Sequence, residues 1–398
     1  MSLTVSLLPA HRRDEAGELW RRVEAGLATP ALAAGWTWTS TWLEHFGDVV
    51  PHRFLVAYRG DEPVATTLVT FSRTGPRVFP RRRLHLGTAG EPVAESVFVE
   101  YNDLLCAPEE LPAVCRAVAA AVRTVPRWDT LTLDGVVPRT AALLGADLGF
   151  ATRETPSWTV RLDPDRTVME TLGRSTRRLV RQAVEALGPE EPELATEPER
   201  AREIFDELVR LHQRRWTAQG EPGAFASIRR HGFVRDVLLR LLAEGRAAVG
   251  RLAGADGLIG CVVGWIDDGR FLYYQGGFAQ YDEVRKRAGL LGHAVFAEHF
   301  RQAGLREYEL LAGDAQYKRQ LSAGEQNPLV WAEHDLAHPR AVALGGIRVL
   351  RDRAGVAAGQ GAAAARERVG SARERVGSAR ERLGSARERV GSARERSS

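Results

Sequence analysis

The chain has 398 residues, enough for two or three domains, and its 44% apolar and 27% charged residues are ordinary usage for a globular protein. No apolar run approaches the roughly 20 residues of a membrane-spanning helix, and the first apolar stretch is too short for a secretory signal. The three cysteines are odd in number and lack metal-ligand spacing, which disfavours a disulfide framework and a metal site. We therefore expect a cytoplasmic protein that binds no metal.

Most of the excess positive charge lies at the carboxyl end. Residues 366–396 contain ten arginines and five glutamates, an excess larger than the formal net charge of +4 of the whole chain. The remainder therefore lacks a general basic surface for nucleic acid. Residues 336–398 are rich in Ala, Gly and Arg and end in repeats of ARERxGS, a composition that predicts a disordered tail able to bind an anionic partner.

The two halves of the remaining chain share one order of elements. In the first half, apolar periodicity and turn residues predict helices and strands at 38–46, 54–58, 64–71, 111–125 and 129–135. The second half repeats this order with one additional strand, at 233–245, 247–252, 258–266, 271–278, 290–304 and 306–313. The repetition predicts an α/β fold of the α+β kind, with similar domains at 1–160 and 161–335 whose mixed, largely antiparallel sheets are flanked by helices.

A helix predicted at 170–187 has one strongly basic face. The spacing i, i+3, i+4 and i+7 places four arginines on it, namely Arg174, Arg177, Arg178 and Arg181. Two interpretations remain open. The face is either a solvated charged surface or a contact surface for an anionic ligand.

The next helix, 203–216, carries a histidine on its apolar face. That face consists of Phe205, Leu208, His212 and Trp216. A histidine in such a stripe is either a hydrogen-bonded core residue or a general base. Trp216 is either a packing residue or part of a substrate site, and the glycine-containing loop after it is expected to border that site.

A basic, glycine-containing loop precedes the helix predicted at 290–304. Lys286 and Arg287 supply positive charge, and Gly289 permits close approach of a backbone just where the helix begins, at Gly289 or Leu290. Free N–H groups and the positive end of the helix dipole point at such a loop, which is the arrangement that holds a pyrophosphate. An ordinary basic surface loop is the alternative.

The stretch GDAQYKRQL, residues 313–321, follows the last predicted strand of the second half. Its Lys318 is one of only two lysines in the chain, the other being Lys286. Asp314 and Tyr317 accompany it. In one interpretation these residues border a reaction site; in the other, Tyr317 packs in the core and Asp314 caps the next helix.

The second half resembles the GNAT acyltransferase superfamily, in particular the double-domain branch that includes CelD-like proteins of cellulose biosynthesis, and more distantly the FemAB peptidyl transferases. The resemblance is carried by RSTRRLVRQA (174–183), FDELVRLHQRRWTAQGEPGAF (205–225), FLYYQGGF (271–278), the loop before LLGHAVFAEHF, and GDAQYKRQL. The first half is similar in WTWTSTWLEHFG (36–47) and in LHLGT followed by YNDLL (84–105). The similarity covers about residues 1–335 and excludes the tail.

The resemblance implies two tandem GNAT-like domains, with acyl-CoA, most simply acetyl-CoA, bound as co-substrate by the C-terminal one. The superfamily's phosphate loop would correspond to Lys286, Arg287, Gly289 and Leu290, although this chain has Leu291 where the family pattern has Gly or Ala. No metal is implied.

The resemblance also implies roles at the reaction site. Tyr317 would give a proton to the departing sulfur, and Lys318 would lower the pKa of Tyr317 or bind phosphate. Asp314 or His212 would accept the proton of the amine. The residues expected to contact the acceptor, or for Gln275 the pantetheine arm, are Gln275, Trp216 and Arg178.

The expected activity is acyl-CoA-dependent N-acyl transfer to a small-molecule amine or an amino sugar. One alternative keeps the fold and changes the donor to an aminoacyl-tRNA, as in FemAB proteins, with the arginine face and the basic tail as docking surface. Apart from that tRNA, nucleic acid is not an expected partner. The other alternative is a non-catalytic scaffold of polysaccharide biosynthesis.

Overall fold

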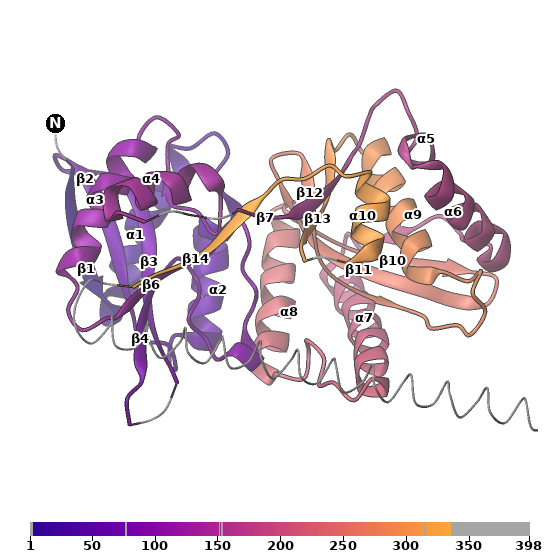
Figure 1. Ribbon diagram of the computed structural model, residues 1–398, viewed down its shortest axis with the longest axis horizontal. Helices are drawn as coiled ribbons and strands as arrows, with labels where there is room; N and C mark the ends of the chain where they lie inside the picture. Colours follow the sequence, from indigo (N-terminus) through magenta and orange to yellow (C-terminus); the bar gives the residue numbers. More distant parts are fainter. Residues whose placement is uncertain (1–2, 76–77, 151, 153, 314, 336–398) are drawn as a thin grey trace, which may run out of the picture. The chain divides into compact units, whose positions relative to one another are not determined.

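The computed structural model describes residues 3–75, 78–150, 152, 154–313 and 315–335 (Figure 1). The predicted tail, 336–398, and Asp314 lie outside the described residues. Residues up to His334 belong to one structural unit.

The first half of the chain contributes seven strands of one sheet and four α-helices in the described residues. Its strands are β1 (Thr4–Pro9), β2 (His52–Arg59), β3 (Glu62–Thr74), β4 (Arg81–Leu86), β5 (Leu105–Cys106), β6 (Thr130–Val136) and β7 (Glu154–Thr155). Its α-helices are α1 (Arg13–Ala25), α2 (Trp36–Phe46), α3 (Leu111–Thr124) and α4 (Pro138–Leu148), and short 3₁₀ turns lie at Ala10–Arg12, Leu32–Ala34 and Val93–Glu95.

The second half contains the longer helices. Its strands are β8 (Ser157–Arg161), β9 (Glu193–Leu194), β10 (Ala247–Gly254), β11 (Gly257–Asp267), β12 (Arg270–Phe278), β13 (Glu307–Ala312) and β14 (Leu329–Asp335). Its helices are α5 (Val168–Thr171), α6 (Arg174–Leu187), α7 (Pro198–Ala218), α8 (Ile228–Ala243), α9 (Ala288–Gln302) and α10 (Gln316–Ser322).

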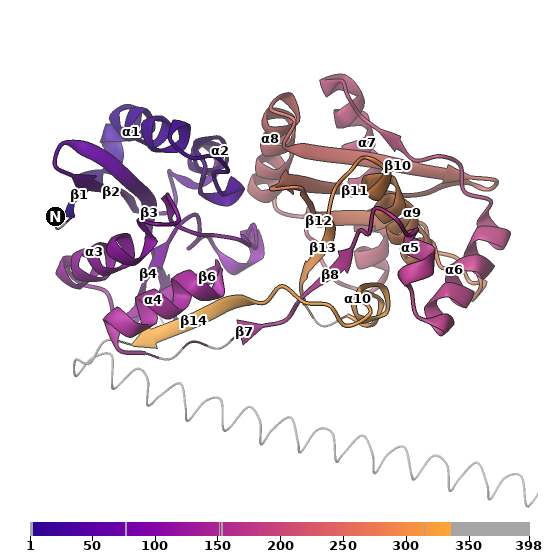
Figure 2. The same ribbon diagram turned by 90° about the horizontal axis from the view of Figure 1, so that it is seen from above.

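The first sheet is completed by the end of the described chain. Its strand order is β1-β2-β3-β4-β6-β14-β7, with β5 paired to β3. Strand β14 therefore lies among elements of the first half, as its orange ribbon shows (Figure 2). The predicted division at 1–160 and 161–335 remains a prediction, and the last strand of the second range pairs in the first sheet.

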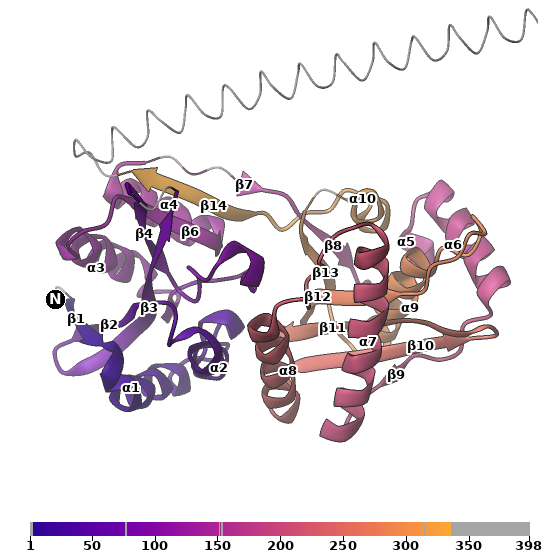
Figure 3. The same cartoon turned by 90° about the horizontal axis from the view of Figure 1, so that it is seen from below.

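The second sheet has the order β8-β13-β12-β11-β10-β9 and is covered on both faces. Helix α7 crosses β10, β11 and β12 (Figure 3). Alternate residues of β10 explain the two faces, because Val249 packs with α7 and α8, whereas Ala248 packs with α6 and α9. The pairs are antiparallel except β12 with β13, so the expected mixed, largely antiparallel arrangement is confirmed.

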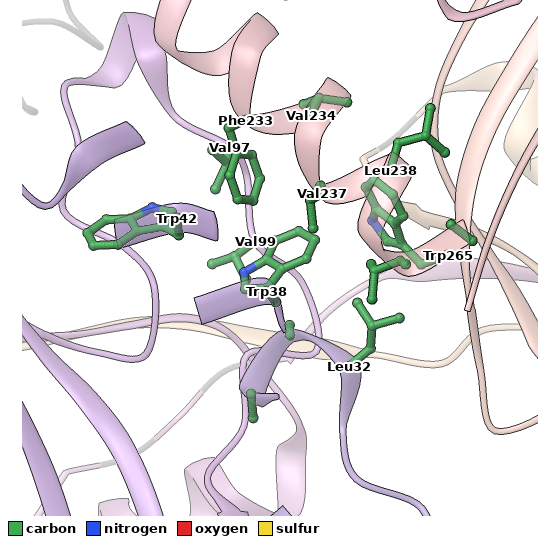
Figure 4. Packing of buried hydrophobic residues seen from close by; sticks show 14 of the residues in the cluster. Leu32, Trp38, Trp42, Val97, Val99, Phe233, Val234, Val237, Leu238 and Trp265 are labelled. Carbon is green, nitrogen blue, oxygen red and sulfur yellow. The ribbon is translucent and has the colours of Figure 1, made fainter. Parts of the chain in front are cut away.

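One hydrophobic core joins residues of both halves. Trp38 of α2 packs edge-to-face against Phe233 of α8 and against Trp265 of β11, with ring centroids 5.1 and 5.7 Å away (Figure 4). The Trp38 indole donates a hydrogen bond to Thr88. Aromatic burial of this kind stabilises the contact between α2 and α8.

Two local predictions differ from the structure. The helix expected at 170–187 is two helices, α5 and α6, because the chain is extended at Leu172 and Gly173 between them. Helix α8 begins at Ile228, five residues before the predicted start, because Ser227 caps it by accepting the N–H of Arg230. In the described part of the chain, no helix is long and apolar enough to cross a membrane.

Candidate active site

The central feature of the second sheet is the separation of β12 from β13. The two strands are paired in parallel for three residue pairs, which end at Leu272 opposite Glu309. Beyond this point β12 stays paired with β11 as far as Phe278, and β13 stays paired with β8. A bulge interrupts each of these remaining pairings, near Tyr274 and near Leu310. One edge of β12 from Tyr273 onward is therefore without a neighbouring strand in the described chain.

A cavity of about 1290 Å³ lies where the strands separate. We call it the central cavity. Its wall includes nine of the eleven predicted site residues, namely His212, Trp216, Gln275, Lys286, Arg287, Gly289, Leu290, Tyr317 and Lys318. Arg178 is exposed on α6 and does not line it. Asp314, the eleventh, lies outside the described residues.

The start of α9 offers free amides to the central cavity. The amide of Ala288 donates to the carbonyl of Lys286, and that of Leu291 to the carbonyl of Arg287. The amides of Gly289 and Leu290 have no such partner in the described chain. A side chain added at Gly289 would meet only Phe278, at 3.7 Å, so the first turn of α9 has room beside it for a larger residue. Free amides at a helix start, with the positive end of the dipole, favour an anion.

The two lysines of the chain line the same cavity, but both ammonium groups are already engaged. Lys286 forms an ion pair with Asp256 at 2.6 Å. Lys318 donates to the carbonyls of Ala312, at 2.6 Å, and Leu311, at 3.3 Å, which ties α10 to the end of β13. Arg287, by contrast, is exposed and forms no ion pair with a described residue.

Tyr317 presents a phenol to the cavity from the first turn of α10. Its ring stacks on the buried imidazole of His293 at 5.0 Å, and His293 in turn shares a hydrogen bond with Tyr308. Burial raises the pKa of Tyr317 to about 12, and the nearby charge of Arg215 opposes this rise. The phenol therefore stays protonated at neutral pH. Arg215, and not Lys318, is the cation that acts on it.

Glu100 enters the central cavity from the first half of the chain. Its carboxylate accepts the N–H of Ala312 at 3.2 Å, and burial raises its pKa to about 7 although Lys318 lies nearby. Two neighbours of Glu100, Phe98 and Tyr101, have φ values of 47° and 55°, and Leu311 has 63°. Bulky residues adopt this conformation at an energetic cost, which is common at functional sites.

His212 is a buried wall residue of the central cavity. Burial lowers its pKa to about 4, so the imidazole is neutral at neutral pH. Its Nδ1 lies 3.2 Å from the side-chain oxygen of Gln213. Gln213 also bonds the backbone of Pro222 and Phe225, which fixes the loop predicted to border the site.

Several cavity residues carried no sequence signal. Glu100 and Arg230 come from segments without a motif, and only the fold brings them beside β12 and β13. His293 lies among apolar residues of α9, a surrounding that is typical of a core residue. The glycines of β12 are explained by the protein itself, because a side chain at Gly277 would collide with the carbonyl of Leu208 at 2.4 Å.

A second cavity, of about 1170 Å³, lies in the first half. Its wall contains a chain of hydrogen bonds from Ser72 to His85, at 2.8 Å, and from His85 to Asp134, at 2.7 Å. A reacting serine also needs free amides for the developing oxyanion. Ser72 lies inside β3 and is paired there with Arg83 of β4, so we assign no chemistry to it.

Comparison with known proteins identifies the domain that carries the central cavity. Residues 174–319 match the family model of the acetyltransferase (GNAT) domain, a region that spans α6 to α10 except the end of α10. This part of the chain is therefore similar to the GNAT acetyltransferase domain, and together with the two-sheet architecture the match confirms the predicted fold class. No curated protein sequence matches the chain. The CelD-like branch stays a prediction.

Solved structures that are similar to this chain are distant from it in sequence. The C-terminal domain of a protein described as a lysylphosphatidylglycerol synthetase, from Agrobacterium fabrum, is 14% identical, with a TM-score of 0.50 over 85% of this chain and 97% of that one. FemX is 10% identical, with a TM-score of 0.48 over 83% and 95%. A tandem GNAT protein from the clavulanic acid biosynthesis pathway is 14% identical, with a TM-score of 0.42 over 84% and 98%. At these identities the likeness concerns the fold alone.

The protonation of Glu100 predicts a pH dependence of stability. The folded chain raises the pKa of this carboxyl from 4.5 to about 7, so it binds a proton more tightly than the unfolded chain does. Stability is therefore lost as pH rises through this interval. Glu100→Gln cannot titrate and removes this pH dependence. In urea unfolding, the free energy of unfolding of the variant minus that of wild type should increase between pH 4.5 and pH 7 by on the order of 3 kcal/mol.

The control for this measurement is Glu185→Gln, on the exposed surface of α6. Its free energy of unfolding should stay parallel to that of wild type across the pH range. A constant difference between wild type and Glu100→Gln at all pH values would contradict the assigned burial of Glu100.

Proposed function

We propose that the protein is an acyl-CoA-dependent N-acyltransferase that transfers an acyl group, most simply acetyl from acetyl-CoA, to the amine of a small molecule. The observation that carries the proposal is the coincidence of three features in the central cavity. These are the free amides at the start of α9, the unpaired edge of β12 and the protonated phenol of Tyr317. The GNAT domain match supports the same class of reaction.

The donor would lie along α9 and β12. The amides of Gly289 and Leu290 would bind its pyrophosphate, and the exposed Arg287 would add charge. Lys286 would contribute only after giving up its ion pair with Asp256 in favour of a phosphate. This surface ion pair adds little to stability. The pantetheine arm carries amides that can pair with the free edge of β12, next to Gln275.

The reaction would proceed by attack of the neutral amine on the thioester carbonyl. The C–N bond forms, the C–S bond breaks, and the products are an amide and free CoA. The ionised carboxylate of Glu100 would accept the proton of the amine, because its pKa of about 7 suits a base at neutral pH. His212, whose pKa is about 4, is the weaker base. Tyr317 would donate its proton to the leaving sulfur.

The proposed phosphate site can be tested without disturbing the fold. Gly289→Asp places a negative charge in front of the free amides, where the side chain has room and an acidic residue favours the helix start. Calorimetric titration with acetyl-CoA should show affinity reduced by roughly tenfold or more, with an unchanged melting temperature.

The matched control is Gly289→Asn, which has the size of aspartate without its charge. Its affinity should stay close to that of wild type. Equal affinity of all three proteins would move the phosphate site elsewhere, and absence of acetyl-CoA binding to wild type would remove the proposed donor.

The role of Tyr317 predicts a separation of turnover from binding. Tyr317→Phe keeps the ring stacked on His293 and removes only the hydroxyl, which forms no hydrogen bond with a described residue. Turnover, followed by release of free thiol from acetyl-CoA, should fall roughly a hundredfold while acetyl-CoA affinity is unchanged. Equal turnover of variant and wild type would exclude Tyr317 from the reaction.

A further inference from the structure

Arg230 is a buried cation without an acidic partner. It is 5% exposed, belongs to the first turn of α8 and lines the central cavity. Its Nε is enclosed and makes no hydrogen bond, and no carboxylate of the described chain lies within ion-pair distance of its guanidinium. The other buried arginine, Arg81, lies beside Glu333 at 3.9 Å. Removing a charge from water is unfavourable unless a partner compensates, so the lone Arg230 requires an explanation.

The contacts that hold Arg230 are aromatic. Its guanidinium carbon lies 4.9 Å from the centre of the Phe98 ring. The Phe98 loop is itself fixed, because Tyr274 of β12 donates a hydrogen bond to the carbonyl of Val97 at 2.8 Å. A ring face orients a guanidinium and partly compensates for its lost hydration, but it accepts no ordinary hydrogen bond. The Nε–H of Arg230 stays unsatisfied, although the guanidinium also reaches the Tyr274 phenol. The arginine is thus oriented in advance for a ligand in the cavity.

Negative charge lies close to Arg230 without pairing with it. Burial raises the pKa of the Tyr274 phenol, the charge of Arg230 and a hydrogen bond with its guanidinium lower it, and the charges of Glu91 and Glu100 raise it. Arg230 and Glu100 therefore act on the same side chain of the cavity wall. This wall consists of α8, the loop around Phe98 and β12, whereas the proposed phosphate site belongs to the start of α9.

We propose that Arg230 binds the carboxylate of the acceptor, so that the acceptor is an amino acid or another amine that carries a carboxylate. The planar guanidinium fork matches a carboxylate in two parallel hydrogen bonds. The acceptor's amine would then face Glu100. The identification of the bound carboxylate compound as the acceptor rests on the proposed N-acyl transfer. The anion site itself rests on the geometry of Arg230.

The charge balance favours a carboxylate over a phosphate. One guanidinium neutralises a single negative charge, and the carboxylate of Glu100 shares the same wall. A dianionic phosphate would leave an excess negative charge beside the carboxylate of Glu100. A zwitterion with an ammonium and a carboxylate matches the two opposite charges of Glu100 and Arg230.

The test compares amines that differ only in a carboxylate. Phenylalanine with phenethylamine and lysine with cadaverine are such pairs, and glucosamine 6-phosphate supplies a dianion. In thermal melts of the full chain, at least one of the two amino acids should raise the melting temperature of wild type and its decarboxylated partner should not. In the thiol-release assay, that amino acid should be preferred roughly a hundredfold in kcat/KM.

Two arginine variants on α8 make the comparison specific. Arg230→Met should keep or raise the melting temperature of the free protein, since an uncompensated buried charge is removed, and should lose both the stabilisation by amino acids and the preference. Arg240→Met removes an arginine that pairs with Glu44 at 2.7 Å away from the central cavity. It should lower the melting temperature and leave the response to amino acids unchanged. Arg230→Lys should retain part of the response.

The outcomes separate this inference from the proposed function. Stabilisation by amino acids that depends on Arg230, in a protein that binds no acetyl-CoA, would support the anion site and reject the donor. Acetyl-CoA binding with no response to either amino acid, or with a response that Arg230→Met retains, would overturn the carboxylate site and leave the donor. A response to glucosamine 6-phosphate alone would overturn the choice of a carboxylate.

Discussion

The separation of β12 from β13 after Leu272 is the constraint on which the site depends. Each strand keeps its outer neighbour, so the sheet stays intact while an interior gap opens within it. The gap brings free backbone groups of β12, the start of α9 and the first turn of α10 to one cavity. Packing on both faces of the sheet holds the strands in this arrangement. The chemistry of the cavity follows from which helices begin at its rim.

The cavity wall is electrically divided. Helix α9 contributes free amides and an exposed arginine, which suit the phosphates of a donor. The other part of the wall comes from α8 and the Phe98 loop, where Glu100 and Arg230 lie without forming an ion pair with each other in the described chain. Because the first half of the chain supplies Glu100 and Phe98, the proposed acceptor site needs both halves. The aromatic core around Trp38 is what keeps α2 of the first half against α8.

The regular elements and the residues of the proposed phosphate site were predictable from sequence, whereas those of the proposed acceptor site were not. Strands β2, β3 and β10 to β13 have apolar alternation bounded by turns, and a basic loop before a helix indicated Gly289 and Leu290. The pairing of β14 with the first sheet and the proximity of Glu100 to Ala312 depend on contacts between residues far apart in the chain. Such contacts leave no local pattern. The hydrogen bonds that Lys318 donates to the backbone carbonyls of Leu311 and Ala312 were equally unpredictable from sequence.

The most direct test of the central claim is hydrogen–deuterium exchange of the chain with and without acetyl-CoA. If the donor occupies the gap between β12 and β13, exchange should slow at the free edge of β12, residues 274–279, and at the start of α9, residues 288–291. Unchanged exchange in both segments, or protection confined to the first sheet, would contradict the assignment of the gap as the donor site.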